Sequence, residues 1–174
     1  MSKAAKILED REYRKWLSRI ENLEQDRKFC RHGMEHLMAV ARICYILCLE
    51  EDIEKKILLA YPALTSIELK EMVYAAALTH DLGRAITYET GGDHAFESKK
   101  LAVPILKTLG FTPEQMEIIL DAVREHRERV AGMSILGDVL YRADKLSRPC
   151  ETCTSQSDCD KIQEMQRIKQ KSFY

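Results

Sequence analysis

Imidazole and carboxylate side chains, the usual protein ligands of divalent metals, recur at the ends and on the apolar stripes of predicted helices. The most informative pair is His80-Asp81, which follows an apolar helical stretch. Four of the five histidines and two aspartates hold comparable positions, namely His36, His80, Asp81, His94, His126 and Asp144. This mixture of nitrogen and oxygen ligands suits Fe, Mn, Ni or Zn better than a thiophilic metal, so these residues predict a metal site.

The number of these groups argues against four isolated core histidines. A single buried histidine is more often a hydrogen-bonded core residue than a ligand. Burying four imidazoles and two carboxylates together is unfavourable unless something compensates them, and coordination compensates all of them at once. Six ligands are more than one zinc ion usually takes, whereas two ions bridged by a carboxylate would use them all. Paired metals clamp the attacking and leaving oxygens of a phosphoryl displacement, which makes this the favoured chemistry.

The elements that must position these residues are predicted to be helices throughout. The chain has only 7 glycines and 4 prolines, and several stretches of helical period. These features favour an all-α domain of about six to eight helices. Glu51 to Leu64 should form a short helix and a turn, because Pro62 interrupts it. The charged tail from Lys161 to Tyr174 fits a terminal helix or a frayed end. The main predicted helices cover about residues 13–23, 32–50, 66–82, 94–109, 113–128 and 134–148.

Local signals place several ligands near helix ends. Thr112-Pro113-Glu114-Gln115 combines an N-cap residue, an initial proline and a capping box, and the helix that it begins holds His126 in its last turn. Gly83 is expected to end the preceding helix that carries His80-Asp81. Gly91-Gly92-Asp93 should form a loop that leads to His94 at the next helix N-terminus.

Composition and charge limit the possible partners. With 174 residues, of which 45% are hydrophobic, the chain should fold as one domain. Its 27 basic and 28 acidic residues nearly balance, so nucleic acid is not indicated. The opening MSKAAKILED lacks an apolar segment and no stretch approaches a membrane span, so we expect a cytoplasmic protein without membrane contact. The expected division is an amphipathic helix over 1–29, a metal-binding core over 30–149, and a cysteine-containing segment and tail over 150–174.

Three segments carry a family resemblance. His36-Leu-Met-Ala-Val40-Ala is similar to the first histidine helix of the HD-domain superfamily of metal-dependent phosphohydrolases. Ala76-Ala-Leu-Thr-His80-Asp81-Leu-Gly-Arg84 resembles its defining doublet, and Tyr141-Arg-Ala-Asp144-Lys145 resembles its final aspartate segment. His94-Ala-Phe-Glu-Ser98 and Glu125-His126 look like the additional histidines of two-metal members, although Arg127 stands where many members have another histidine.

The resemblance implies one or two divalent ions (Fe, Mn, Ni, Mg or Zn) and a catalytic role for Asp81 as the bridging ligand. One site would use His36, His80 and Asp144, and the other His94 and His126. A metal-bound hydroxide would attack the phosphoester of a nucleotide or another small phosphorylated metabolite. Arg84, Lys145 and Arg148 lie beside these ligands in the sequence, where they would hold the phosphate or simply form surface ion pairs. The sequence leaves the substrate, the metal and the oligomeric state open.

Other functions fit parts of the same pattern. Some HD-type proteins use a di-iron pair with this ligand order as oxygenases, and a non-catalytic nucleotide or metal sensor would also use these ligands. His32-Gly33-Met34-Glu35-His36 fits the H-x-x-E-H pattern of inverzincin peptidases, but that reading leaves the other ligands unexplained. His32 is more simply a residue that orients a metal-bound histidine. Glu51 to Leu64 and Thr87 to Asp93 are expected to shape the pocket.

The six cysteines fall into two sets. Cys44 and Cys48 lie on an apolar helical stripe and are expected in the core. Cys150, Cys153 and Cys159 cluster just after the last predicted ligand, and Cys30 is a candidate fourth member. Four thiolates would bind a zinc ion or an iron–sulfur cluster, whereas the alternative is a polar loop with reduced cysteines.

Overall fold

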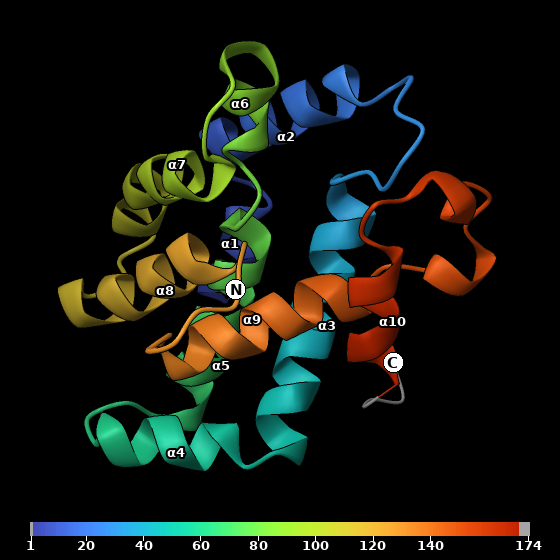
Figure 1. The fold of residues 1–174 in the computed structure, drawn as a ribbon. Coiled ribbons are helices and arrows are strands. Elements are labelled where there is room, and N and C mark those ends of the chain that lie inside the picture. The colour runs from blue at the N-terminus through green and yellow to red at the C-terminus, as the bar shows by residue number, and fades with distance from the viewer. Residues whose placement is uncertain (1, 171–174) are drawn as a thin grey trace.

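The computed structural model describes residues 2–170, which form helices and no strands (Figure 1). The all-α prediction is therefore confirmed. The α-helices are α1 (Lys3–Ile7), α2 (Arg11–Leu23), α3 (Met34–Glu50), α4 (Ile53–Ala60), α5 (Ser66–Thr79), α6 (Arg84–Thr90), α7 (His94–Thr108), α8 (Pro113–Glu125), α9 (Ile135–Leu146) and α10 (Ile162–Lys169), with 3₁₀ turns η1 (Cys150–Thr152) and η2 (Gln156–Asp158). Within the described residues, no helix is both long and apolar enough to span a membrane.

Helix α5 is the centre of the bundle. Apolar side chains surround it on almost every side, and it packs against α1, α3, α4, α7, α8 and α9. The run Ala75-Ala76-Ala77 is fully buried. Small side chains there let neighbouring helices approach closely, and a helix that is apolar all round belongs in a core. The position of α5 therefore fixes where His80 and Asp81, just beyond its last residue, emerge.

Linked capping boxes set the start of α5 and α8. Thr65 caps α5 with Glu68, and Thr112 caps α8 with Gln115, as predicted for the second. Gln115 Nε2 also donates to Glu68 Oε1 at 3.1 Å, so the two helix starts are held together. At their other ends, α5 runs into His80 and α8 into His126, each as the C-cap residue. The same pair of helices thus brings two of the predicted ligands side by side.

The remaining ligands come from α3, α7 and α9. Helix α3 buries the stripe that was expected, including Cys44 and Cys48, which are confirmed as core residues. Asp93 caps α7 and places His94 at its first position. Ser134 caps α9, which packs across α3 and α8 and carries Asp144.

Two segments differ from the sequence prediction. Helix α5 ends at Thr79, and a turn leads from His80 to the short helix α6. This helix includes the first part of Thr87 to Asp93, which was expected to be a loop that shapes the pocket. Gly83 caps α6 with an ordinary αR conformation, and does not end α5. Glycine at this position lets the turn after α5 approach the backbone of α7 closely. An added Cβ would overlap the His94 carbonyl oxygen and lie 2.5 Å from the Ser98 nitrogen of α7. The amphipathic helix expected over 1–29 is also divided, into α1 over Lys3–Ile7 and α2 over Arg11–Leu23.

The C-terminal segment leaves the bundle after α9. It passes through η1 and η2 and returns as α10, which packs on α9. In Figure 1 its orange and red turns lie beside the blue connection between α2 and α3. The tail prediction is thus met by a helix over Ile162–Lys169, while residues 171–174 lie outside the described range.

Candidate metal centre

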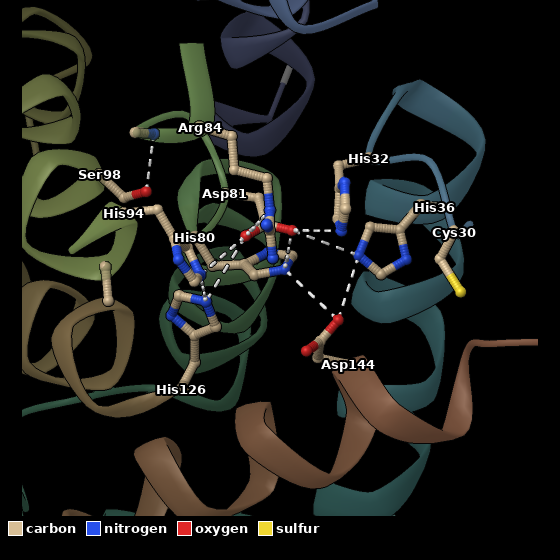
Figure 2. Close-up of polar contacts among 12 residues, drawn as sticks. Cys30, His32, His36, His80, Asp81, Arg84, His94, Ser98, His126 and Asp144 are labelled. Carbon is tan, nitrogen blue, oxygen red and sulfur yellow. Dashed lines mark hydrogen bonds and ion pairs between the residues drawn. The ribbon is translucent and has the colours of Figure 1, made fainter. Parts of the chain in front are cut away.

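Asp81 stands at the middle of the candidate centre, with ligand-type side chains on both sides (Figure 2). Its Oδ2 lies 3.3 Å from His80 Nε2 and 3.6 Å from His36 Nε2. Its Oδ1 lies 3.4 Å from His94 Nε2 and 3.6 Å from His126 Nε2. A single carboxylate therefore offers one oxygen to each side.

The six predicted ligands come together as two groups that share Asp81. One group is His36, His80, Asp81 and Asp144, and the other is Asp81, His94 and His126, with the ligand atoms of each group within 4.8 Å of one another. Asp144 Oδ1 lies 3.2 Å from His36 Nε2 and 3.8 Å from His80 Nε2. His94 Nε2 and His126 Nε2 are 3.2 Å apart. Each group is compact enough to surround one ion.

Backbone carbonyls orient the two C-cap histidines in the same way. The Nδ1–H of His80 donates to the Ala77 carbonyl at 2.6 Å, and that of His126 donates to the Val123 carbonyl at 2.7 Å. In the neutral rings the lone pair is therefore on Nε2, which points at Asp81. A metal-binding histidine usually donates its other ring N–H to a carbonyl or carboxylate in this way, which fixes the orientation of the ring.

These lone pairs face carboxylate oxygens, which also carry lone pairs. Within the described chain, His80 Nε2 and both oxygens of Asp81 are buried without a hydrogen-bond partner. Several acceptors aimed at one point repel one another unless a cation lies between them. The nitrogen and oxygen donors present thus fit one or two divalent ions of borderline or hard character.

The protonation states of the side chains in the centre also favour the binding of a cation. Burial opposes ionisation of Asp81, but Arg84 and His80 hold the pKa of this carboxyl well below its usual range. Burial would lower the pKa of His80, yet the adjacent Asp81 and Asp144 raise it to about 9. Burial lowers the pKa of His94 to about 3 and also lowers that of His126. The raised pKa of His80 means that its ring carries a second proton, on Nε2, until a metal ion replaces it. The other group presents neutral imidazoles, the form that binds metal.

The three predicted phosphate-binding cations lie against the ligand carboxylates. Arg84 Nε is 2.8 Å from Asp81 Oδ1, in an ion pair that lacks hydrogen-bond alignment. Lys145 Nζ donates to Asp144 Oδ2 at 2.7 Å. Arg148 donates to Asp144 Oδ1 and to His36 Nε2, both at 2.9 Å. An ion bound by these two atoms would therefore displace the Arg148 guanidinium.

Sequence reasoning missed a buried chain behind Asp81. The Nδ1 of His32 contacts the Glu24 carboxylate, which also accepts from the Tyr88 hydroxyl. Burial lowers the pKa of His32 to about 4, so its ring is neutral, and its Nε2 lies 3.9 Å from Asp81 Oδ2. This is the carboxylate–histidine arrangement found around metals. No spacing rule joins Glu24 or Tyr88 to the ligands, because neither belongs to the histidine motifs.

The cavity at the centre is shaped by segments other than those expected. It measures about 560 Å³ and is lined by His94, His126 and Asp144 together with residues of the α2–α3 connection, the α8–α9 connection and the C-terminal segment. Glu51 to Leu64 does not line it, since α4 lies at the opposite end of α3 (Figure 1). Glu35, the base required by the peptidase pattern, is exposed, whereas His32 and His36, the two histidines of that pattern, are buried.

The four cysteines lie beside the histidine and aspartate groups, since Cys30, Cys150 and Cys159 also line the cavity at the centre. Cys30, Cys150, Cys153 and Cys159 line a neighbouring cavity of about 740 Å³. Figure 2 shows the Cys30 sulfur directed away from Asp81.

Comparison with known proteins agrees with this geometry. The family model of the HD domain matches residues 33–148, which include all six candidate ligands. An uncharacterized protein of Clostridium beijerinckii is 34% identical over 163 residues, which cover 94% of each chain. No solved structure matches the chain significantly. HD domains generally are hydrolases that bind divalent metals, and this chain belongs to the HD-domain superfamily.

Proposed function

We propose that this protein is a metal-dependent phosphohydrolase that cleaves a phosphoester of a nucleotide or another small phosphorylated metabolite. The observation that carries the proposal is the sharing of Asp81 by two ligand groups, with one carboxylate oxygen facing each. Paired ions on such a carboxylate would lower the pKa of coordinated water toward about 7 and draw charge from the phosphoryl oxygens.

The residues of the chain would hold the metal ions and keep their carboxylate ligands ionised. Asp81, His36, His80 and Asp144 would hold one ion, and Asp81, His94 and His126 the other. Arg84 keeps Asp81 ionised, and Lys145 and Arg148 do the same for Asp144. His32, held by Glu24, would present the Nε2 lone pair of a neutral ring beside Asp81.

The charge of the cavity supports an anionic substrate. Four acidic side chains line it, against seven basic ones: Arg27, Arg84, Arg127, Arg129, Lys145, Arg148 and Lys161. An excess of cations in a concave site raises the local concentration of an anion, and guanidinium groups match phosphate geometry. The volume lies in the range of small-molecule sites, which suits a nucleotide-sized ligand.

The test is phosphate release from a panel of nucleotides and phosphorylated metabolites by protein loaded with Mn or Fe. Wild-type protein and the isosteric Asp81→Asn variant are compared with and without oxygen. We expect release by the wild type under both conditions and a loss of about 10³-fold or more in the variant, the size of effect that follows loss of a major catalytic interaction. Arg127→Gln, at the cavity rim, should instead raise KM with little change in kcat.

Other outcomes identify the alternatives. Substrate oxidation that requires oxygen, without phosphate release, would overturn the proposal in favour of a di-iron oxygenase. Tight nucleotide binding by the metal-loaded protein without any product would overturn it in favour of a sensor.

A further inference from the structure

We propose that Cys30, Cys150, Cys153 and Cys159 form a second metal centre, in which four thiolates bind a thiophilic metal as a zinc ion or an iron–sulfur cluster. This centre would share no ligand with the neighbouring histidine and aspartate groups and would act as a structural clamp between the two segments that carry the cysteines. The proposal stands on the shared cavity of these cysteines, on the contacts that join the two segments carrying them, and on the lack of an apolar core in the C-terminal segment.

All four cysteines line one cavity. They are free cysteines in the described chain and together line the cavity of about 740 Å³ between the α2–α3 connection and the C-terminal segment. Burial raises the pKa of the Cys150 thiol, and the nearby Cys30 and Cys159 raise it further. A bound cation would compensate the charge of the thiolates, so metal binding would release their protons.

Polar contacts around the thiols already join the two segments. Ser155 Oγ donates to the Lys28 carbonyl at 3.2 Å, and Arg148 donates to the Arg31 carbonyl at 3.0 Å. Lys28 also pairs with Asp158. These contacts flank Cys30 on one segment and Cys150 and Cys159 on the other. The backbone therefore places the segment that carries Cys30 beside the segment that carries the other three cysteines.

The C-terminal segment has almost no apolar core of its own. Among residues 150–170 only Cys150 and Ser155 are buried, and η2 and α10 bury no residue. Hydrophobic burial is too small to hold such a segment in place, and small units of this kind are commonly stabilised by a structural metal. The spacing Cys150-x2-Cys153 also supplies two ligands from one short turn, as in zinc knuckles.

Binding would require local movement of side chains. The described chain does not bring three of these sulfurs within 4.8 Å of one another. Cys30, Cys153 and Cys159 are only half-buried, so their side chains have room to turn toward a common point. This adjustment is the expected coupling of metal binding to local folding.

The test compares metal content and free thiols in protein purified without oxygen. Variants are Cys153→Ser and Asp81→Asn, with Cys48→Ala as the control that removes a core thiol. The wild type should hold about one zinc equivalent, or iron with matching sulfide and visible absorption, beyond the metal bound by the histidine groups. Cys153→Ser should lose this fraction alone, Asp81→Asn should retain it, and Cys48→Ala should match the wild type.

A second measurement on the wild type does not depend on a variant that folds. Titration with a thiol reagent should release the thiophilic metal in step with modification of four thiols. If the wild type holds no zinc or iron–sulfur cluster beyond the histidine sites, or if Cys153→Ser keeps it, the inference is wrong. The metal content of the histidine groups in Asp81→Asn tests only the proposed hydrolase, and the metal content of the cysteines tests only this inference. Either proposal can therefore fail without the other.

Discussion

At the scale of single residues, the geometry of the centre depends on the contacts of both polar atoms of each ligand, the two ring nitrogens of a histidine or the two oxygens of an aspartate. His80 and His126 both use Nδ1 on a carbonyl three residues back, so Nε2 is left for the centre. Asp81 uses neither oxygen in a hydrogen bond, and it divides them between two groups. This division predicts that the two metal sites can be lost one at a time or together, according to the residue that is changed.

His94 provides the selective test of that division. His94→Ala should reduce bound metal from about two equivalents to about one, because the His36, His80 and Asp144 group does not use this side chain. Metal analysis after extensive dialysis measures the difference. Loss of both equivalents, or of neither, would contradict the separation into two groups.

The six candidate ligands could be identified from sequence, because their residue types, helix positions and order were sufficient. The contacts of Arg148 could not, since a residue four positions after Asp144 gave no sign that it reaches both Asp144 and His36. Glu24 was also missed, because it lies in the last turn region of an amphipathic helix whose other polar residues are solvated. Tertiary packing alone brings it to His32.

At the scale of elements, the approach of α7 to the turn after α5 depends on Gly83. Gly83→Ala would press a methyl group against the α7 backbone at His94 and Ser98, and overpacking of this kind costs about 1–3 kcal/mol. We expect lower stability in urea and weaker metal binding by the His94 group. Gly33→Ala is the control, because the nearest atoms to its added methyl group belong to the flexible Glu21 side chain. Equal effects of both substitutions would contradict the packing argument.

Arg142 joins α9 to the end of α3 through a paired contact with Glu51, at 2.6 and 2.8 Å. The Arg142 hydrogen bond lowers the pKa of Glu51. The contact therefore adds stability above the unfolded-state pKa of Glu, about 4.3, and loses it as the pH falls through the lower folded value.

Glu51→Gln should reduce the free energy of unfolding by up to about 1 kcal/mol at pH 7, since the pair is half exposed. The difference from the wild type should shrink as the pH falls below about 4.3, and should vanish at a pH below the lowered folded pKa, where both states carry a neutral group at this position. Urea unfolding at the two pH values measures it, with the exposed Glu9→Gln as the control. A difference that persists at low pH would show a packing effect instead.

Helix starts were the most predictable elements, and short connections the least. Thr112 with Gln115, Ser134 and Asp93 each cap a helix as their residue types indicated. Helix α6 was not foreseen, because it spans 7 residues and buries only Ala85, which leaves no periodic apolar pattern to detect. Its start depends on the tight contact of Gly83 with α7, a tertiary feature.

At the scale of the whole molecule, the centre lies where α3, α5, α7, α8 and α9 converge. The order of the ligand segments along the chain could be predicted from the sequence. The residues that line the cavity could not, because they lie in connections without a periodic apolar pattern or a recognisable motif. A metal held by several helices at once would bind the folded chain and not the unfolded one, so it should stabilise the entire domain.

Removal of metal should therefore lower the Tm. At a free metal concentration of about 100 times Kd, binding adds about 2.7 kcal/mol to the free energy of unfolding. For a chain of this size that corresponds to a change in Tm of about 5–10 °C. Scanning calorimetry with and without a chelator measures the change. Asp81→Asn should respond much less than the wild type; an equal response would place the stabilising metal elsewhere.

The most direct test of the central claim is the metal content of wild-type protein and Asp81→Asn, purified side by side without oxygen. The shared carboxylate predicts about two equivalents of Fe, Mn, Ni, Mg or Zn in the histidine groups of the wild type, and loss of both in the variant. A wild type without metal, or a variant that retains the same metal content, would contradict the assignment of this cluster as a two-metal centre.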